Sequence, residues 1–290
     1  MPYKDILIVD TLTSNAKVNI GLNILDKCNN GYHALESLIQ EISIGDIITI
    51  TICKSFGDII IKSKGIELNC SNIDNTCYRI AHYLKKEYNI QNKIIIELDK
   101  KIPIGSGLGG GSSNAATILN FLDSSLNLKL TYKNKINICK QIGMDVSFFL
   151  KGSLQYAEGL GEITTMMPPL FKGYSILVIN PAFSISTKWA YSALNKNLPS
   201  NKMHYNLLAL EDPFNWGLFR NDFEAIVIPG YPEVRVLKAV MLNSGAVYSS
   251  LSGSGSTVFG IYNNYDQALS ASKKIDHKKY HITVTSPIYR

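Results

Sequence analysis

The most informative stretch of this sequence is PIGSGLGGGSSNAA, residues 103–116. Five of the seven residues in the glycine loop, residues 105–111, are glycine; glycine reaches positive φ without strain and lets the backbone approach a ligand closely. Residues 115–122 are good helix formers with an apolar face. Ser112 and Ser113 are expected at the start of this helix, where hydroxyls cap and free N–H groups point outward. A glycine-rich loop that opens into a helix N-terminus predicts a phosphate site rather than a plain connection.

Three standard phosphate-binding motifs do not describe this loop. Gly105, Gly107 and Gly110 have the spacing of the dinucleotide fingerprint, but Pro103 interrupts the entry from a strand. The spacing also suits a P-loop, yet a Gly-Ser pair replaces the Lys-Ser or Lys-Thr pair of that motif. The sequence has no H-R-D or D-F-G segment of a protein kinase. The loop therefore belongs to another class of phosphate-binding protein.

Composition places the chain among soluble folded proteins. Of its 290 residues, 46% are hydrophobic and 18% are charged, which suits a sizeable core. A typical domain of ~150 residues makes two domains the starting expectation. No run approaches the ~18 apolar residues of a membrane span, and the first ten residues lack the apolar stretch of a signal peptide. We therefore expect a cytoplasmic protein.

Charge and cysteine content argue against two other classes. Lysine and arginine outnumber aspartate and glutamate by 29 to 23, a net charge of +6. This excess suits an anionic small substrate or nucleic acid, but the chain has no block of basic residues, so we favour scattered surface lysines over a nucleic-acid partner. The five cysteines are odd in number and form no C-x-x-C pair. Reduced thiols are therefore expected, rather than a disulfide framework or a zinc site.

Hydrophobic patterns along the chain predict an α+β architecture in two domains, 1–165 and 166–290. Alternating or β-branched runs predict strands at 6–9, 17–25, 45–52, 58–62, 93–98, 174–181, 247–251, 257–262 and 281–285. Helical spacing predicts helices at 75–88, after Ser112, and at 132–142, 188–194, 222–227 and 232–243. Pro168 and Pro169 can continue neither a helix nor a central strand, which favours a boundary before them. Strands and helices without regular β-α-β alternation are typical of α+β proteins.

Two further segments complete a resemblance to the GHMP kinase superfamily, whose phosphate loop has the pattern P-x-G-x-G-L-G-S/G-S-S-A. Near the N-terminus, A-K-V-N-I-G-L at 16–22 resembles the family's P-A-K-x-N-L segment, with Asn15 in place of the usual proline. Near the C-terminus, L-S-G-S-G-S-T-V-F at 251–259 resembles its third motif, G-S/T-G-x-x-V-F. The resemblance implies a two-lobed fold. The N-terminal lobe would be ribosomal-protein-S5-like and carry the ATP phosphate loop, and the C-terminal lobe would be ferredoxin-like.

Three shorter segments are similar to one branch of this superfamily. They are G-Y-H at 31–33, G-M-D-V-S-F-F at 143–149 and A-E-G-L-G-E at 157–162. The enzymes of that branch belong to non-mevalonate isoprenoid (terpenoid) biosynthesis and use ATP to phosphorylate the 2-hydroxyl of a cytidine diphosphate-linked methylerythritol. The resemblance implies the same small-molecule substrate here. Residues 194–247 match nothing in the family pattern.

The resemblance also assigns binding roles to individual residues. ATP with Mg²⁺ is the implied cofactor; the sequence does not identify the Mg²⁺ ligands beyond Ser112 or Ser113 as candidates. The expected nucleotide-binding residues are Pro103, Ile104, Gly105, Ser106, Gly107, Leu108, Gly109, Gly110, Gly111, Ser112, Ser113, Asn75 and Lys101. The expected substrate-binding residues are Asn19, Tyr32, His33, Thr187 and Tyr191. Tyr32 and Tyr191 would stack on the two faces of the cytosine ring, and core packing is the alternative for an isolated tyrosine.

Lys17 and Asp145 are the expected catalytic residues. A hydroxyl loses a proton as it attacks the γ-phosphorus, and Asp145 is expected to accept that proton. Lys17 is expected to keep the aspartate ionised and to balance the developing charge. The alternative is a structural ion pair between the two side chains.

Three rival functions can be compared with these expectations. Another kinase of the superfamily, acting on mevalonate, homoserine or a sugar, would have no base to stack on the G-Y-H segment. A catalytically silent ATP-binding regulator would not need both Lys17 and Asp145. An RNA-binding module would need a concentrated basic and aromatic surface, which the sequence does not indicate. The small-molecule kinase is therefore the expected function, with no nucleic-acid or membrane partner, and the sequence does not predict the oligomeric state.

Overall fold

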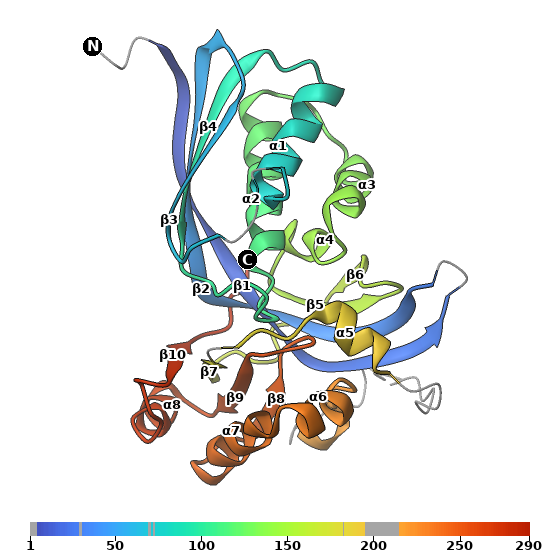
Figure 1. Cartoon of the computed structure of the whole chain (residues 1–290), viewed down its shortest axis with the longest axis vertical. Coiled ribbons are helices and arrows are strands. Elements are labelled where there is room, and N and C mark those ends of the chain that lie inside the picture. The colour runs from blue at the N-terminus through green and yellow to red at the C-terminus, as the bar shows by residue number, and fades with distance from the viewer. Residues whose placement is uncertain (1–4, 29–30, 69–70, 72, 182, 195–214) are drawn as a thin grey trace. The chain divides into compact units, whose positions relative to one another are not determined.

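The computed structural model describes residues 5–28, 31–68, 71, 73–181, 183–194 and 215–290, and its contacts divide the chain into two compact units. Unit 1 comprises residues 1–16, 44–104 and 109–151, and unit 2 comprises residues 17–43, 105–108 and 152–290. Two long strands, β1 (Ile6–Lys27) and β2 (His33–Phe56), have residues in both units (Figure 1). The division follows contacts rather than chain order, so the boundary between residues 165 and 166 stays a prediction.

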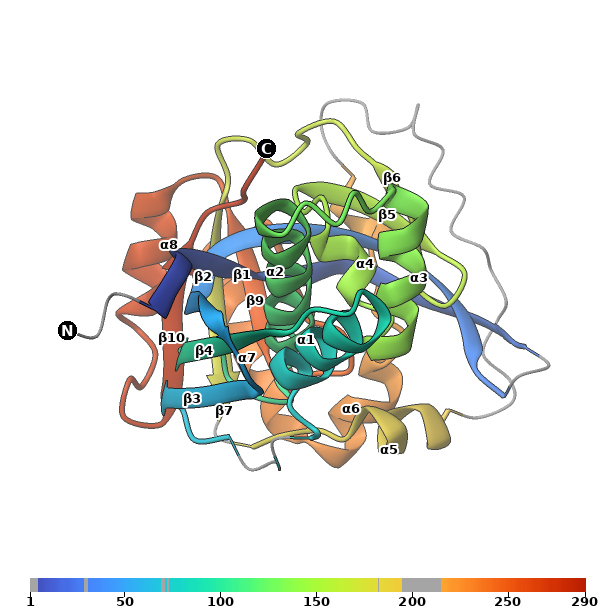
Figure 2. The same ribbon diagram turned by 90° about the horizontal axis from the view of Figure 1, so that it is seen from above.

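Unit 1 is a sheet with helices on one side (Figure 1). Strand β4 (Asn92–Lys100) pairs antiparallel with β2 and parallel with β3 (Ile59–Gly65), and β1 pairs with β2. On β2, the side chains of residues 48, 50 and 52 are buried isoleucines that alternate with threonines, as in a strand with one face on the core. The helices, seen from above in Figure 2, are α1 (Thr76–Glu87), α2 (Gly110–Ser125), α3 (Tyr132–Ile142) and α4 (Val146–Phe149).

Unit 2 contains a four-stranded antiparallel sheet in the order β10-β7-β9-β8. Helices follow β7 and β9, so the chain runs β-α-β-β-α-β, and the expected ferredoxin-like lobe is confirmed. The strands are β7 (Ser175–Pro181), β8 (Tyr248–Leu251), β9 (Val258–Tyr262) and β10 (Tyr280–Thr285). The helices are α5 (Thr187–Ser192), α6 (Glu224–Gly230), α7 (Pro232–Asn243), α8 (Tyr265–Ser272) and the short 3₁₀ helix η3 (Trp216–Leu218). Two more strands, β5 (Leu154–Glu158) and β6 (Ile163–Met166), extend from β2.

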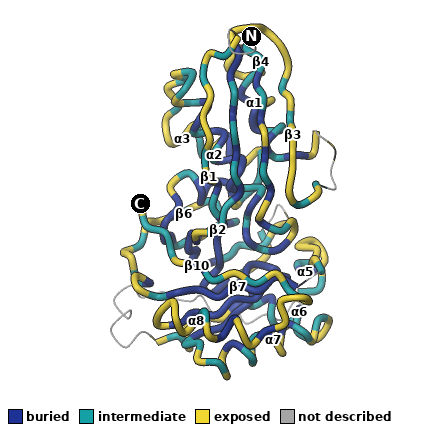
Figure 3. The backbone as a smooth tube through the Cα atoms, turned by 90° about the vertical axis from the view of Figure 1, so that its left-hand side faces the viewer, coloured by how far each residue is buried: buried dark blue, intermediate teal, exposed yellow. Residues whose placement is uncertain are grey.

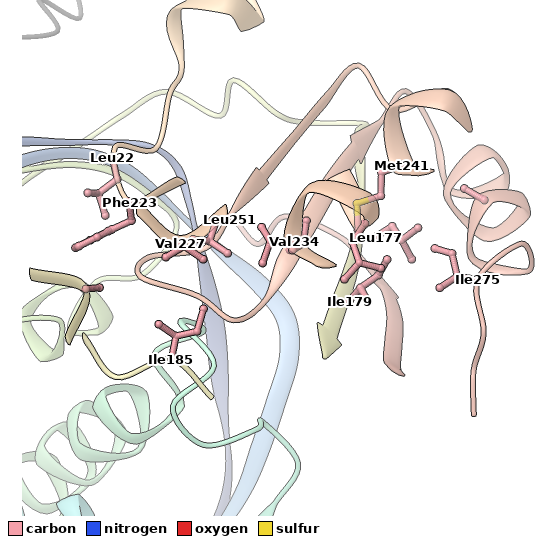
Figure 4. Close-up of a cluster of buried hydrophobic side chains, with 14 of the residues drawn as sticks. Leu22, Leu177, Ile179, Ile185, Phe223, Val227, Val234, Met241, Leu251 and Ile275 are labelled. Carbon is pink, nitrogen blue, oxygen red and sulfur yellow. The ribbon is translucent and has the colours of Figure 1, made fainter. Parts of the chain in front are cut away.

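One hydrophobic cluster joins this sheet to its helices. Strand β7 is buried along its whole length (Figure 3). Its Leu177 and Ile179 belong to a cluster with Val234 and Met241 of α7 (Figure 4). Leu237 of the same helix is also a member of this cluster. Leu22 of β1 belongs to the same cluster, so the strand that begins unit 2 is packed into a core whose other members come from residues 177–275 and Ile24.

Helices whose ends are specified by neighbouring residues were predicted well. The helices at 132–142 and 232–243 have the predicted bounds. A capping box at Thr131 begins α3, and Gly143 ends it. Asn75 caps α1, its Oδ1 accepting the N–H of Cys77 at 2.9 Å. These signals lie within a few residues of the element that they specify.

Strand predictions were less complete. The strands predicted at 6–9 and 17–25 form one strand, because pairing with β2 satisfies the backbone of the polar residues between them. Strands β5 and β6 were missed, since runs of 5 and 4 residues are too short to establish a period. Helices α4 and α8 were also missed.

Two further expectations concern cysteines and membrane spans. Cys28, Cys53, Cys77 and Cys139 are free thiols, in agreement with the expectation of reduced cysteines, and Cys70 lies outside the described residues. Within the described parts of the chain, the helices are all too short or too polar to cross a lipid bilayer.

A matched pair of leucines on α7 tests the packing of unit 2. Leu237 is 2% exposed in the cluster, and Leu242 is 47% exposed on the same helix. Leu237→Ala should lower the free energy of unfolding by about 2–5 kcal/mol because it leaves a cavity. Leu242→Ala should change it by no more than about 0.5 kcal/mol. Urea denaturation of both variants measures the difference, and similar losses would contradict this assignment of the core.

Candidate functional site

In unit 2, the glycine loop is interlocked with the third-motif loop, residues 252–257. Gly107 has φ +80°, and a Cβ atom there would lie 2.0 Å from the carbonyl oxygen of Ser252. The Ser252 hydroxyl donates to the carbonyl of Gly107 at 2.8 Å, and the N–H of Thr257 donates to the carbonyl of Ser106 at 3.1 Å. Glycine at position 107 is therefore required by this close main-chain approach.

Lys17 and Asn19, both on β1, lie against these two loops. The N–H of Lys17 donates to the carbonyl of Leu108 at 2.9 Å. Its ammonium donates to Asn19 Oδ1 at 2.5 Å, and the Asn19 amide donates to the hydroxyl of Ser37 at 2.8 Å. A Cβ atom on Gly253 would lie 3.5 Å from both Lys17 Nζ and Asn19 Oδ1. The three motifs identified in the sequence thus meet within unit 2, around a lysine that is only 4% exposed.

In unit 1, helix α2 begins earlier than the sequence suggested. Ser112 and Ser113 were expected at its start as caps, but the N-cap is Gly109, with φ +71° and no side-chain cap. Glycine takes the left-handed conformation that this entry requires, so the serines lie inside the first turn. The Ser113 hydroxyl instead accepts a hydrogen bond from Ser14 at 2.7 Å. A helix start without a side-chain cap presents N–H groups to an anion.

A buried ion pair fixes the strand end that leads into the loop. Asp46 Oδ2 lies 2.6 Å from Lys100 Nζ, and Asp46 Oδ1 accepts the N–H groups of Lys101 and Ile102 at 2.7 and 2.8 Å. A Cβ atom on Gly110 would lie 2.9 Å from Lys100 Nζ, so this ammonium lies beside the first turn of α2. Burial lowers the pKa of Lys100, and the Asp46 carboxylate opposes that shift.

Neither residue of this pair was predicted from the sequence. Asp46 follows a glycine at the start of an alternating run, where an aspartate is ordinarily a turn residue. Of the two adjacent lysines, Lys101 was expected to bind the nucleotide. Its side chain is exposed, whereas Lys100 is buried beside the loop. The alternation along β4 distinguishes the two, because the buried positions 94, 96 and 98 continue to Lys100.

The structure brings two of the aromatic residues expected around the base into contact. The rings of His33 and Tyr191 stack with centroids 5.7 Å apart and 15° between their planes. Tyr32, which was expected to face Tyr191, is 60% exposed. The hydroxyls of Thr187 and Ser254 share a hydrogen bond of 2.9 Å, which joins the start of α5 to the third-motif loop. The structure therefore brings His33 against Tyr191 and leaves most of the Tyr32 side chain accessible.

The remaining predicted residues lie in unit 1. Asp145 is exposed at the start of α4. Arg79 of α1 donates to the carbonyls of Gln141 and Ile142 at 2.9 and 3.2 Å, which holds the end of α3 just before Asp145. Asn75 is the cap of α1, and its neighbour Thr76 donates to the carbonyl of Gly111 at 2.8 Å. Asn75 is thus close in sequence to a residue that contacts the glycine loop.

Few of the described side chains in this site are suited to bind a metal ion. The described residues contain no group of three or more His, Cys, Asp or Glu side chains placed to hold a metal ion. Of the two serines suggested for Mg²⁺, Ser113 is buried against Ser14, and Ser112 is half-buried. Ser112 is therefore the better candidate to reach a metal ion that arrives with a phosphate ligand.

Comparison with known proteins gives consistent matches over the chain. A family model described as "GHMP kinases N terminal domain" matches residues 75–153, and one described as "GHMP kinases C terminal" matches residues 203–282. The chain is 35% identical to the 4-diphosphocytidyl-2-C-methyl-D-erythritol kinase of Chlorobium phaeobacteroides over 96% of this chain and 95% of that protein. It is 34% identical to the enzyme of the same name from Alkaliphilus metalliredigens over 93% and 94% of the two chains.

Solved structures agree at the level of the fold. A crystal structure of 4-(cytidine 5'-diphospho)-2C-methyl-D-erythritol kinase has a TM-score of 0.80 at 24% identity, covering 97% of this chain and 100% of that one. A homoserine kinase from Cytophaga hutchinsonii has a TM-score of 0.67 at 20% identity, covering 99% and 96%. A mevalonate kinase from L. major, in complex with R-mevalonate, has a TM-score of 0.70 at 14% identity, covering 100% and 99%.

Two loop glycines provide a test of the interlocked geometry. Gly105 and Gly107 both have positive φ, so alanine costs about 1–2 kcal/mol of backbone strain at either position. A Cβ atom on Gly105 meets only Ser184, at an ordinary 3.6 Å. Gly107→Ala must also displace the Ser252 carbonyl, which should cost about 1–3 kcal/mol more. Chemical denaturation compares the two variants, and equal losses of stability would show that the loops are not interlocked.

Proposed function

The chain belongs to the 4-diphosphocytidyl-2-C-methyl-D-erythritol kinase family of the GHMP kinases, and from this premise we propose which part of the kinase reaction each site residue carries out. The reaction transfers the γ-phosphoryl group of ATP to the 2-hydroxyl of 4-diphosphocytidyl-2-C-methyl-D-erythritol, in non-mevalonate isoprenoid biosynthesis. The observation that carries the proposal is the meeting of Lys17, Asn19 and the two glycine-containing loops within unit 2. A buried cation beside loops that permit close backbone approach is suited to phosphate groups.

The glycine loop and the start of α2, residues 103–113, are proposed to bind the ATP phosphates. The uncapped N–H groups at Gly110 and beyond would donate to phosphate oxygens, and the positive end of the helix dipole favours their charge. Lys100 adds a cation beside the same turn. Mg²⁺ would arrive with the nucleotide and neutralise charge on its phosphates, with the Ser112 hydroxyl as its candidate protein ligand.

Asp145 and Lys17 are proposed to carry out the chemical step. Asp145 would accept the proton of the 2-hydroxyl as that oxygen attacks the γ-phosphorus. Lys17 would balance the charge that develops on the transferred group. Asn19, whose carbonyl oxygen already holds the Lys17 ammonium, would orient both the lysine and the substrate. Asp145→Asn tests the proposed pairing of Lys17 with Asp145.

The cytidine end of the substrate is proposed to bind at Tyr32, His33, Thr187 and Tyr191. The exposed Tyr32 ring would lie on one face of the base and Tyr191 on the other, so His33 would have to separate from Tyr191 or contact the base by its edge. His33 and Thr187 offer polar groups for the Watson–Crick edge. Aromatic stacking on a base contributes about 1–3 kcal/mol.

Substrate identity is tested by a panel of phosphate acceptors. ATP consumption by the purified chain is compared with 4-diphosphocytidyl-2-C-methyl-D-erythritol, mevalonate and homoserine as acceptors. The expected result is turnover of the cytidine compound alone, with phosphorus NMR placing the new phosphate on the 2-hydroxyl. Faster turnover of mevalonate or homoserine would overturn the proposed function. The predicted cytoplasmic location and the absence of nucleic-acid or membrane partners stay predictions.

Asp145→Asn is expected to affect the rate and not binding. Asparagine keeps the shape of the side chain but does not accept the proton, so kcat should fall about 10²–10⁴-fold. The KM for each substrate should change little, because the phosphate and stacking contacts remain. Steady-state kinetics measure both quantities. Asp123→Asn is the matched control: it removes a carboxylate that pairs with Lys135 in the same unit, and should leave kcat unchanged.

Two other outcomes would contradict this role. A near wild-type kcat in a folded Asp145→Asn variant would remove Asp145 from the mechanism. Weakened binding of both substrates together with a lower melting temperature would favour the structural ion pair.

Tyr32→Ala is expected to affect the cytidine substrate alone. Loss of one stacking face, about 1–3 kcal/mol, should raise the KM for this substrate about 5- to 100-fold and leave the KM for ATP unchanged. Tyr191→Phe keeps its ring and should be nearly neutral. Tyr265→Ala removes another half-exposed tyrosine, at the start of α8, and controls for the loss of a surface ring. An unchanged substrate KM in Tyr32→Ala would remove Tyr32 from the base site.

A further inference from the structure

Residues 220–223 lie in a segment where no family motif was recognised in the sequence, although the C-terminal family model covers it, and they lie beside the strand that carries Lys17. The N–H of Leu22 donates to the carbonyl of Arg220 at 2.7 Å, and the N–H of Asp222 donates back to the carbonyl of Leu22 at 2.9 Å. The Asp222 carboxylate accepts the N–H of Ile24 at 2.8 Å. These bonds form a short parallel bridge along β1, only a few residues beyond Lys17 and Asn19.

The side chain of Asn221 connects this bridge to the third-motif loop. Its amide group donates to the carbonyls of Leu251 and Gly253, both at 2.8 Å. Its carbonyl oxygen accepts the N–H of Phe223 at 3.0 Å. Asn221 is 4% exposed, and two of its hydrogen bonds hold backbone groups on both sides of Ser252. The backbone bonds of the flanking Arg220 and Asp222 join Asn221 to β1. A buried amide bonded in this way fixes the position of the loop, because each lost bond leaves a buried polar group without a partner.

The loop that Asn221 holds is in contact with the proposed phosphate side of the site. Gly253 lies next to Lys17 Nζ and Asn19 Oδ1, and Ser252 donates to the carbonyl of Gly107 in the glycine loop. A shift of the 251–253 backbone would therefore disturb both the surroundings of the lysine and the glycine loop. Glu224 holds the same backbone, accepting the N–H of Leu251 at 2.9 Å.

We propose that Asn221 is a positioning residue for phosphoryl transfer, which holds the third-motif loop against Lys17 and the glycine loop. This inference rests on the proposed function for its kinetic readout. Asn221 touches neither substrate in this scheme; it acts through the backbone of Leu251 and Gly253. Displacement of a reacting group by about 1 Å is sufficient to slow a reaction by about 10²-fold.

The neighbouring Phe223 gives the proposal a second, independent readout. Its buried ring packs edge-on against Tyr191, with centroids 5.0 Å apart and 86° between the planes. Tyr191 is on the proposed base side of the site, whereas Gly253 is on the phosphate side. Substitutions at these two positions, which are two residues apart, should therefore have different effects. Substitution of Asn221 should affect kcat, and substitution of Phe223 should affect the KM for the cytidine substrate.

The experiment compares Asn221→Ala with Asn264→Ala in the full chain. Asn264 caps α8 in the same unit, with its Oδ1 accepting the N–H of Gln267, and it has no part in the proposed site. Asn221→Ala should lower kcat about 10- to 100-fold, with the KM for the cytidine substrate within about threefold of wild type. Asn264→Ala should lower the melting temperature and leave kcat unchanged. Phe223→Leu should raise the KM for the cytidine substrate several-fold and leave the KM for ATP unchanged.

Suppose that the wild-type chain turns over the substrate, and that kcat falls no more in Asn221→Ala than in Asn264→Ala. This result would overturn the positioning role of Asn221 and leave the proposed function intact. A wild-type chain with no turnover would overturn the proposed function. In that case, MgADP binding measured by calorimetry decides the role of Asn221. The Kd of Asn221→Ala should be at least about threefold weaker than wild type, because the glycine loop is no longer held, and an unchanged Kd would overturn the inference. If Asn221→Ala does not fold, Asn221→Ser, which keeps one donor, takes its place in both measurements.

Discussion

A Cβ atom on residue 107 would overlap the carbonyl oxygen of Ser252, and the packing of three chain segments depends on its absence. Because the two loops approach so closely, the carbonyl of Leu108 reaches the N–H of Lys17, and Gly253 comes to lie beside the Lys17 ammonium. The contacts between these segments are largely main-chain contacts, so their geometry depends on backbone conformation more than on side-chain shape. A site built in this way can hold a lysine almost fully buried, because the surrounding carbonyl and amide dipoles replace the water that it loses.

The sequence was informative wherever the physical signal is local. Helix α3 was predicted to the residue because Thr131 and Gly143 specify its ends within one turn. The glycine loop was found because positive φ restricts the choice of residue at several neighbouring positions. The third motif was found through its resemblance to the family pattern, and its Gly253 and Gly255 also have positive φ. The exact start of α2 was not, because any of three successive glycines can provide the turn into the helix, and only the structure selects Gly109.

The residues that hold the site together were not predictable in this way. Asp46 and Asn221 each bond to backbone groups that are far away in the sequence, and a single aspartate or asparagine in a polar segment resembles an ordinary turn residue. Lys100 and Lys101 are chemically identical, and only the alternation of buried positions along β4 distinguishes them. The stacking of His33 on Tyr191 likewise depends on two elements that are distant in sequence. Local rules therefore locate the groups that meet a ligand better than they locate the groups that orient them.

The interleaved order of the chain has a consequence for synthesis on the ribosome. Unit 2 requires residues 17–43 to join partners that emerge much later: Ile24 bonds to Asp222, 198 positions away, and Gln40 bonds to Ile288, 248 positions away. Contacts of such high sequence separation form slowly, because long loops must close before any contact is gained. The apolar residues of β1, including Leu22 and Ile24, must therefore stay without their final partners until nearly the whole chain has emerged. During that interval the nascent chain exposes a β-strand that is prone to pair with other chains. Chaperones, rather than the fold itself, must then prevent this pairing.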